Sequence, residues 1–280
     1  MTPSKFLPQN FDETAAVALL AGKGEYPKIT LQNARKSGIK VKLVAFEDET
    51  DEDLYESFDD CDRVRINIGQ LGKLLKNVKK FGAKYAIMAG QITPKKLFKG
   101  LTPDLRAIAI LATLKEKNAE TIFGAIANEL SKIGCELLDA RSFLDSNLAH
   151  KGFNSGKSWS IKEEHLEHAM KIARACASLD IGQSCVVSRG SVLAVEAFEG
   201  TDKMIERAAQ FEAKDALFAK TVKPNQDYRF DVPVVGERTI RKLAEAKIFN
   251  AAVEAEKVII LNPEHSLKLA ENLGVKIFGV

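Results

Sequence analysis

The sequence predicts a two-domain α/β protein: a Rossmann-like N-terminal domain with a parallel sheet, followed by a smaller C-terminal α/β domain. Short apolar segments alternate with segments of helical periodicity in the first half, which is typical of a parallel sheet with helices on both faces. A stretch rich in Gly, Ser and Asn, residues 143–160, then interrupts this alternation, and we expect it to be the interdomain linker or a mobile loop. At 280 residues the chain is long enough for two hydrophobic cores. We therefore assign residues 1–145 to the first domain and 146–280 to the second.

The predicted parallel sheet consists of short apolar strands. They are expected at 15–22, 40–47, 61–67, 84–92 and 135–140. Between the strands, apolar residues recur at helix spacing, as Leu71, Leu74, Leu75 and Val78 do. Helices are therefore expected at 26–38, 69–82, 103–116 and 119–133. The acidic stretch 48–60 is expected to form an exposed loop or a short helix.

The second half has a different order of elements. Residues 161–180 have the periodicity of an amphipathic helix. Two apolar runs joined by a two-residue turn with glycine predict a hairpin over 184–198. A helix over 199–211 follows, with Thr201 as its N-cap, and then an apolar strand over 215–223.

A pattern of period two comes next. Asp227, Arg229 and Asp231 alternate with Tyr228 and Phe230, which predicts a strand that carries the three charges on one face. Neighbouring charges on that face would lie roughly 6.5–7 Å apart. This spacing suits a cation or a phosphate between two side chains, and it equally suits an Asp–Arg–Asp ladder with no ligand.

The composition excludes several classes of protein. Hydrophobic residues make up 45% and charged residues 28%, as in ordinary globular proteins. The net charge is +3 without a block of Lys and Arg, so neither a nucleic-acid partner nor a polybasic membrane contact is expected. The four cysteines include no CxxC pair and are expected to be free thiols in a reducing compartment. With no secretory signal and no apolar stretch approaching about 20 residues, we expect a cytoplasmic protein.

Glycine-containing loops follow two of the predicted strands, with Gly22 and Gly24 after the first and Gly90 after the fourth. Ligands bind at the carboxyl ends of the strands in open parallel sheets, and glycine lets backbone N–H groups approach a phosphate. We expect these loops to contact a phosphate or nucleotide, although a tight turn alone would also explain Gly22 and Gly24. Gln70, at the start of a predicted helix, is placed to hydrogen-bond a base or sugar, and close helix packing at Gly72 explains this stretch equally well.

Acids gather near strand ends in the second domain, with Lys223 and Arg229 among them. Taken singly, such acids are more often structural than catalytic. The sequence has no GxSxG, Walker A or kinase motif. Carboxylates with a hard divalent cation, and basic groups that bind phosphate oxygens, are suited to cleaving a phosphoanhydride. The acids in question are Glu196, Glu199, Asp202, Asp227 and Asp231.

Specific strings then suggest a family. "EGTD" (199–202) and "KPNQDYRFDVP" (223–233) occur together with "LLAGKGEYP", "NIGQLGKLLK", "MAGQI" and "LTPDLRA" of the first half. Over almost its whole length the chain resembles the UDP-2,3-diacylglucosamine pyrophosphatases of the LpxI type, a family of lipid A biosynthesis. The resemblance implies hydrolysis of UDP-2,3-diacylglucosamine to UMP and 2,3-diacylglucosamine 1-phosphate, with Mg²⁺ or Mn²⁺, on a substrate held between the two domains.

The resemblance also implies roles for individual residues. Asp227 is the first choice for the catalytic or metal-holding acid, and Asp231 is the second. Arg229 and Lys223 would hold phosphate oxygens. The wall of the cleft opposite them would contain Glu199, Thr201 and Asp202, with Glu199 and Asp202 as further metal ligands. The first domain would contribute the substrate-binding residues Gly22, Gly24, Gln70 and Gly90.

Such a lipid substrate is compatible with loose attachment to the inner membrane, and the sequence is also compatible with a homodimer. Two acyl chains need an apolar surface, which 107–114 and 121–130 are apolar enough to provide, although packing in the core is the preferred interpretation of both.

Two other functions fit parts of the sequence. A nucleotide-sugar binding protein with the same cleft would bind the substrate and release no UMP. A nicotinamide oxidoreductase would use "GKGEYP", with Glu47 on the ribose hydroxyls. Pro27, which stands where the third glycine of a dinucleotide fingerprint belongs, and the acidic second domain count against the oxidoreductase.

Overall fold

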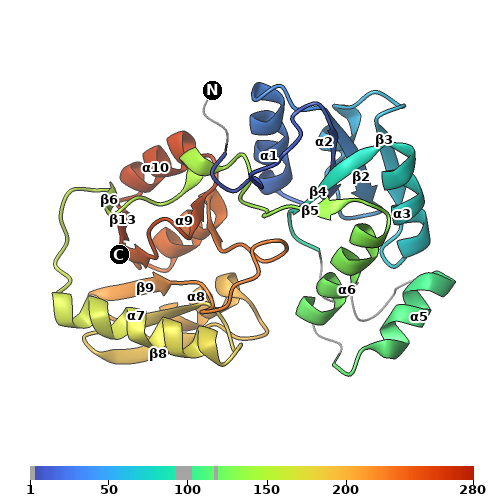
Figure 1. Ribbon diagram of the computed structural model, residues 1–280. Helices are drawn as coiled ribbons and strands as arrows, with labels where there is room; N and C mark the ends of the chain where they lie inside the picture. The colour runs from blue at the N-terminus through green and yellow to red at the C-terminus, as the bar shows by residue number, and fades with distance from the viewer. Residues whose placement is uncertain (1–3, 93–102, 117–118) are drawn as a thin grey trace. The chain divides into compact units, whose positions relative to one another are not determined.

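The computed structural model describes residues 4–92, 103–116 and 119–280, and the chain forms two compact units (Figure 1). Unit 1 comprises Met1–Asp145 together with Tyr228–Phe230. Unit 2 comprises Ser146–Asp227 together with Asp231–Val280.

Unit 1 contains a parallel sheet with the strand order β3-β2-β1-β4-β5. Because β1 has β2 on one side and β4 on the other, the order of the strands reverses beside β1, as in doubly wound folds. This arrangement confirms the predicted α/β fold with its parallel N-terminal sheet. The strands are β1 (Ala16–Ala21), β2 (Val41–Phe46), β3 (Arg63–Ile66), β4 (Ala83–Ala89) and β5 (Glu136–Leu137).

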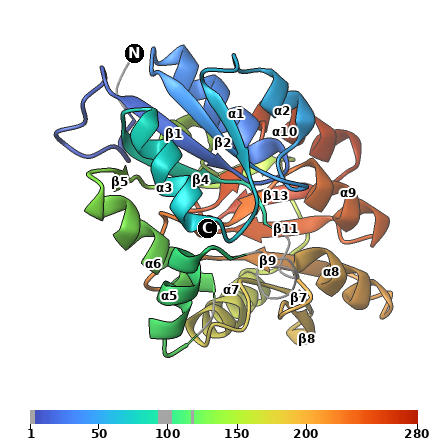
Figure 2. The same cartoon turned by 90° about the vertical axis from the view of Figure 1, so that its right-hand side faces the viewer.

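Helices of unit 1 lie between these strands in the chain. They are α1 (Glu25–Lys36), α2 (Glu52–Glu56), α3 (Leu71–Lys80), α5 (Leu105–Thr113) and α6 (Ala119–Lys132). In the same cartoon turned by 90°, α3, α5 and α6 lie on one side of the unit 1 sheet (Figure 2). The acidic stretch 48–60, predicted to be an exposed loop or a short helix, contains the short helix α2.

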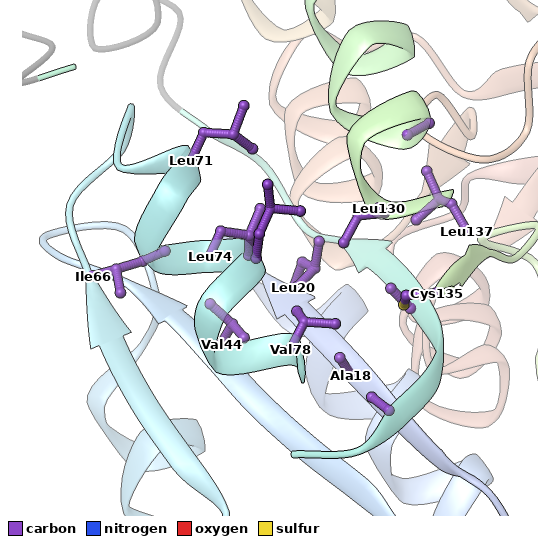
Figure 3. Packing of buried hydrophobic residues seen from close by; sticks show 14 of the residues in the cluster. Ala18, Leu20, Val44, Ile66, Leu71, Leu74, Val78, Leu130, Cys135 and Leu137 are labelled. Atoms are coloured by element: carbon purple, nitrogen blue, oxygen red, sulfur yellow. The ribbon is translucent and has the colours of Figure 1, made fainter. Parts of the chain in front are cut away.

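A hydrophobic core lies between the sheet and the helices α3 and α6 (Figure 3). Ala18 and Leu20 of β1 meet Leu74 and Val78 of α3 there, and Leu130 of α6 joins them. The helix-spaced residues of α3 thus form its buried face, as their periodicity predicts. By contrast, α5 buries few of its apolar side chains: Ala107 is its buried residue.

One carboxylate caps two helices of unit 1. Asp104 Oδ2 accepts a hydrogen bond from Gly72 N–H in the first turn of α3 at 2.6 Å. Asp104 Oδ1 accepts one from Ala107 N–H in the first turn of α5 at 2.9 Å. A Cβ atom at position 72 would lie 3.0 Å from Asp104 Oδ2, so glycine gives the carboxylate room to reach the backbone. The Asp104 carboxylate therefore joins the starts of α3 and α5.

Unit 2 contains a mixed sheet with the strand order β6-β13-β11-β9-β7-β8. β9, β11 and β13 run parallel, and β7, β8 and β6 are antiparallel to their neighbours. This second sheet confirms the predicted C-terminal α/β architecture. Its strands are β6 (Gly152–Ser155), β7 (Ser184–Ser188), β8 (Ser191–Val195), β9 (Ala216–Lys220), β11 (Asn250–Val253) and β13 (Lys276–Gly279).

Further elements of unit 2 surround the sheet. A second, two-stranded parallel sheet pairs β10 (Val234–Val235) with β12 (Ile259–Ile260). A short 3-10 helix spans Asp145–Asn147. The helices are α7 (Glu163–Ser178), α8 (Thr201–Ala209), α9 (Glu237–Glu245) and α10 (Pro263–Asn272).

The predicted hairpin is confirmed, and two other local predictions are corrected. β7 and β8 pair across Arg189 and Gly190, whose φ angles of 47° and 85° are those of a tight hairpin turn. The expected linker contains strand β6, which pairs with β13. Thr201 is the first residue of α8 and not its N-cap. Gly200 occupies the cap position with φ 83°, and the Thr201 hydroxyl is hydrogen-bonded elsewhere.

The segment from Asp227 to Asp231 is not a strand, so that prediction is wrong. Its three middle residues form a turn, in which Asp231 N–H donates to the Asp227 carbonyl at 3.2 Å. The Phe230 ring lies 5.8 Å from the Phe123 ring and packs against the core of unit 1. The alternation arises because aromatic residues of this turn pack in unit 1, and not because the segment pairs with a neighbouring strand.

Across the part of the chain that the structure describes, no helix combines the length and the apolar character needed to cross a membrane. All four cysteines are free, and Cys135 and Cys185 are buried.

Asp104→Ala should lower the free energy of unfolding by about 1–3 kcal/mol, because two helices each lose a cap worth about 1 kcal/mol. Asp51→Ala is the matched control, since Asp51 precedes α2 without a side-chain capping bond. Its ion pair with Lys28 is partly exposed and is worth about 1 kcal/mol or less. Denaturant unfolding measures both, and equal losses would refute the double-cap role.

Candidate active site

The candidate active site lies at one edge of the sheet of unit 2. The parallel strands β9 and β11 end at Lys220 and Val253, which are paired in register. Because β7 runs antiparallel to β9, its first residue, Ser184, pairs with Lys220. β8 ends at Val195 opposite Cys185. The carboxyl ends of β8 and β9 and the start of β7 therefore bring polar residues of distant segments to one place.

Gln183 connects two carboxylates at this edge. Its side-chain Nε2 donates to Asp231 Oδ2 at 2.8 Å, and its backbone N–H donates to the Glu196 carboxylate. Its carbonyl accepts from Thr221 N–H at 2.9 Å, which fixes the Gln183 backbone to the end of β9. Gln183 Oε1 is buried without a hydrogen-bond partner among the residues described. A buried acceptor of this kind fits a donor from a ligand or water.

Gly182 explains how the chain comes so close to Glu196. A Cβ atom at position 182 would lie 2.2 Å from the Glu196 carbonyl oxygen. Only glycine leaves this space, and Glu196 N–H donates to the Ser184 carbonyl at 2.8 Å. The close approach of these two segments sets the geometry of the Gln183 bridge.

Glu196 is the centre of a partly buried group of polar side chains. Ser184 Oγ donates to Glu196 Oε2 at 2.6 Å, and Thr201 Oγ1 donates to Glu196 Oε1 at 2.6 Å. Lys220, which is buried, lies with its Nζ 3.3 Å from Thr201 Oγ1. Burial alone would raise the pKa of Glu196, but the Lys220 charge and the two hydroxyl donors outweigh it and hold the pKa below its ordinary value. Glu196 is therefore an anion that fixes the first residue of α8.

Asp231 is held by two neutral amides. Besides Gln183, Gln226 Nε2 donates to Asp231 Oδ2 at 2.7 Å and to the Asp231 carbonyl at 2.8 Å. Gln226 Oε1 in turn accepts from Lys223 N–H at 2.9 Å. Amide donors orient the Asp231 carboxylate without pairing it with a positive charge. Asp227 is half-buried and belongs to the same turn, in which its carbonyl accepts from Asp231 N–H.

The other predicted acids form ion pairs with arginine. Glu199 Oε1 lies 2.5 Å from Arg207 Nη2, and Asp202 Oδ2 lies 3.0 Å from Arg238 Nε. The second oxygen of Asp202, Oδ1, is buried and has no hydrogen-bond partner within the described part of the chain. Both acids flank the start of α8, where the helix dipole favours a negative charge.

The predicted phosphate-binding cations differ in their surroundings. Lys223 forms an ion pair with Asp180. Arg229 is exposed, and its guanidinium lies 5.8 Å from the centre of the Phe230 ring. It belongs to the turn that is part of unit 1.

These residues could hold a divalent metal ion only through one or two carboxylates. Among the residues described, no three His, Cys, Asp or Glu side chains are grouped closely enough to hold a metal ion. Mg²⁺ typically takes one or two protein carboxylates and completes its shell with water and substrate oxygens. Asp231, which is held by neutral amides, fits this mode, whereas the arginine partners of Glu199 and Asp202 compete with a metal for their carboxylates.

In unit 1, the predicted glycine residues serve first to pack two loops together. Gly22 N–H donates to the Ala89 carbonyl at 2.8 Å, and a Cβ atom on Gly22 would lie 2.6 Å from the Gln91 carbonyl oxygen. Gly90 has φ 92°, and a Cβ atom there would lie 2.7 Å from Pro27. Close packing of the two loops therefore explains why positions 22 and 90 are glycine, without a bound phosphate.

Gly24 and Gln70 lie at helix starts of unit 1. Gly24, with φ 95°, is the N-cap of α1 and has open space at the position of a Cβ atom. Gln70 is the N-cap of α3, and its Oε1 accepts from Asn67 N–H at 3.1 Å. Open space beside a helix N-terminus makes Gly24 the better placed of the glycine residues for a ligand.

Sequence reasoning missed four residues of the unit 2 site: Gln183, Ser184, Lys220 and Gln226. Ser184 and Lys220 carried a signal, because each is a polar residue at the end of an otherwise apolar strand. Gln183 carried no signal, and Gln226 carried none beyond the string "KPNQDYRFDVP" that contains it. An amide that orients an acid has no pattern of its own.

Glu196→Gln should lower the melting temperature at neutral pH, because hydrogen bonds to a charged group contribute about 1.5–3 kcal/mol. Since the pKa of folded Glu196 is depressed, this stabilisation is present above the ordinary glutamate pKa of about 4.3 and is lost as the pH falls through the folded value. The gap between wild type and variant should therefore narrow in acid. Glu167→Gln, at an exposed position of α7, is the control with little gap at any pH. A gap for Glu196→Gln that is independent of pH would contradict this account.

Comparisons with known proteins cover both halves of the chain. The model of the LpxI N-terminal domain matches residues 16–147, and that of the LpxI C-terminal domain matches residues 151–278. A UDP-2,3-diacylglucosamine pyrophosphatase LpxI from Caulobacter vibrioides is 30% identical over 278 residues, which cover 94% of this chain and 97% of the relative. The chain belongs to the LpxI family.

Proposed function

We propose that this protein hydrolyses the pyrophosphate bond of UDP-2,3-diacylglucosamine in lipid A biosynthesis and releases UMP and 2,3-diacylglucosamine 1-phosphate. Family membership and the name of the Caulobacter relative support the substrate and the reaction. The single structural observation that carries the proposal is the hydrogen-bonded chain from Asp231 through Gln183 to Glu196 and Thr201.

The start of α8 is suited to a phosphate. The first N–H groups of a helix have no acceptor within the helix, and α8 has no side-chain cap. Gly200 places the chain in a left-handed conformation just before them. Lys220 and Thr201 add a cation and a hydroxyl beside this turn. Glu196 holds Thr201 in place, so these groups are oriented before a substrate arrives.

Asp231 and Asp227 are the proposed acids of the reaction. A carboxylate whose charge is intact can orient a water molecule, accept its proton or hold a metal ion. The two amides on Asp231 Oδ2 leave its other oxygen to face a reacting group. Cleavage then breaks a phosphoanhydride bond, and the oxygen of water forms the new bond to phosphorus.

A divalent cation, Mg²⁺ or Mn²⁺, is part of the proposal. When bound, it would neutralise the charge of the phosphate oxygens. Asp231 and Asp227 would hold it, with Arg229 and Lys223 on phosphate oxygens. Contacts of the substrate with Gly24 and Gln70 of unit 1 stay a prediction, as does its placement between the domains.

The decisive assay incubates the protein with UDP-2,3-diacylglucosamine and Mg²⁺ and detects UMP and the lipid phosphate. A non-catalytic nucleotide-sugar binding protein would bind the substrate and release no UMP. Binding without turnover under these conditions would replace the hydrolase by that alternative.

Chelation should remove the activity. EDTA is expected to abolish UMP release, and excess Mg²⁺ or Mn²⁺ should restore it, because one or two carboxylates hold the ion weakly and exchange it readily. The melting temperature with EDTA is the control for unfolding. Full turnover in a metal-free sample would show that the reaction needs no metal.

Asp227→Asn and Asp231→Asn should each lower kcat by roughly 10²–10⁴-fold with little change in KM, as expected when a positioned base or metal ligand is lost. Asp215→Asn is the control, since Asp215 forms an exposed ion pair with Arg189. It should leave kcat nearly intact and lower stability by at most about 1 kcal/mol. If Asp227→Asn keeps the wild-type kcat, the role passes to Asp231 alone.

A further inference from the structure

Helix α5 exposes an apolar face that the core of unit 1 does not cover. Leu105 is 86% exposed and Ile108 is 50% exposed, and Ala109 and Ala112 are exposed as well. At helix spacing these four residues form one stripe, opposite the buried Ala107. The sequence favoured packing of residues 107–114 in the core. That prediction is wrong for Ile108, Ala109 and Ala112, which are exposed. Two large apolar side chains on one exposed stripe indicate a binding surface more than a scattered surface residue does.

The neighbouring helix α3 presents a row of lysines to solvent. Lys73, Lys76 and Lys80 lie on the face opposite its buried leucines, and Lys79 is exposed beside them. None of the four forms an ion pair with a residue that the structure describes, and neither α3 nor α5 contains an acidic residue. The helix dipole explains a basic residue in the last turn, where Lys79 and Lys80 lie. It does not explain Lys73 and Lys76, which lie nearer the start of the helix.

The Asp104 carboxylate brings the two faces together. It accepts from Gly72 N–H and from Ala107 N–H, so the starts of α3 and α5 are joined. Leu105 directly follows Asp104, and Lys73 directly follows Gly72. Figures 1 and 2 show α3 and α5 on the same side of the unit 1 sheet. The start of the apolar stripe and the start of the unpaired basic row thus lie next to each other in the fold.

We propose that this surface, Leu105, Ile108, Lys73 and Lys76, docks unit 1 on an anionic lipid bilayer. A short helix with an apolar face lies in the plane of a membrane interface when basic residues beside it reach the lipid headgroups. Each lysine near an anionic surface contributes about 1 kcal/mol, which is about fivefold in partitioning. Unpaired lysines favour negatively charged lipid over a neutral surface or an apolar peptide groove. The inference goes beyond the proposed reaction and does not depend on it, because it concerns lipid binding without substrate.

The test is co-sedimentation of the full chain with vesicles in the absence of substrate. The probes are vesicles of phosphatidylcholine alone and of phosphatidylcholine with an equal part of phosphatidylglycerol. The wild type should bind the anionic vesicles and lose binding as salt rises, because screening weakens surface charge interactions. Equal binding to both vesicle types, or binding to neither, would overturn the proposal.

Two pairs of variants locate the surface. Lys73→Gln with Lys76→Gln should weaken binding about 25-fold, at fivefold for each lysine. The control is Lys36→Gln with Lys40→Gln, which removes the same charge from exposed positions elsewhere in unit 1. It should stay within about twofold of the wild type, since the surface potential falls off within a Debye length. Equal losses in the two lysine pairs would reduce the effect to net charge and overturn the docking surface.

Leu105→Ser with Ile108→Ser should weaken binding at least about tenfold, given the apolar area that each side chain buries in lipid. Leu179→Ser with Phe211→Ser removes two exposed apolar side chains from unit 2 and should change little. All four positions are exposed, so the melting temperature should hold. Equal losses in both apolar pairs would show that the α5 stripe is not a specific docking face.

The UMP assay uses dispersed substrate and no vesicles. A failure of lipid docking can therefore be told apart from a failure of the hydrolase proposal.

Discussion

The candidate site depends on one residue, Gln183, which ties two carboxylates to one strand end. Its side chain holds Asp231 and its backbone N–H holds Glu196, while its own carbonyl is fixed by Thr221. A carboxylate brought to a sheet edge without such donors would lose hydration with no compensation. Gly182 makes the bridge possible, because a side chain there would collide with the Glu196 backbone. The orientation of Asp231 and the position of Thr201 both follow from this one constraint.

The two units use the same physical device for different ends. In unit 1, the Asp104 carboxylate accepts hydrogen bonds from the first turns of two helices and so holds α3 and α5 together. In unit 2, Glu196 accepts from two hydroxyls and a backbone N–H and lies beside Lys220. These groups outweigh the effect of burial, so the pKa of Glu196 lies below its ordinary value and the carboxylate stays charged. In both cases several hydrogen-bond donors fix the orientation of a half-buried carboxylate. Only the second lies beside side chains that can take part in chemistry.

Most of the fold was predictable because its signals are local. The strands of unit 1 are short apolar runs, and α3 buries the residues whose spacing is helical. The turn from Asp227 to Asp231 was not predictable, because Tyr228 and Phe230 are ordered by contacts with residues far away in the chain. Strand β6 was missed because its sequence, Gly152–Ser155, is short and has Phe153 as its one large apolar residue, and because its place comes from pairing with β13. The acids of the site were found from their clustering, whereas their amide partners were not, because hydrogen bonding between side chains leaves no period in the sequence.

Gln183 and Asp231 should act as one unit in turnover, and a double-mutant cycle on kcat measures whether they do. Gln183→Ala, Asp231→Asn and the double variant are compared with the wild type, with melting temperatures on the same samples. Residues that act together are not additive. We expect the double variant to lose no more activity than Asp231→Asn alone, because Gln183 acts through that carboxylate. Losses that multiply in the double variant would show instead that the two residues act independently.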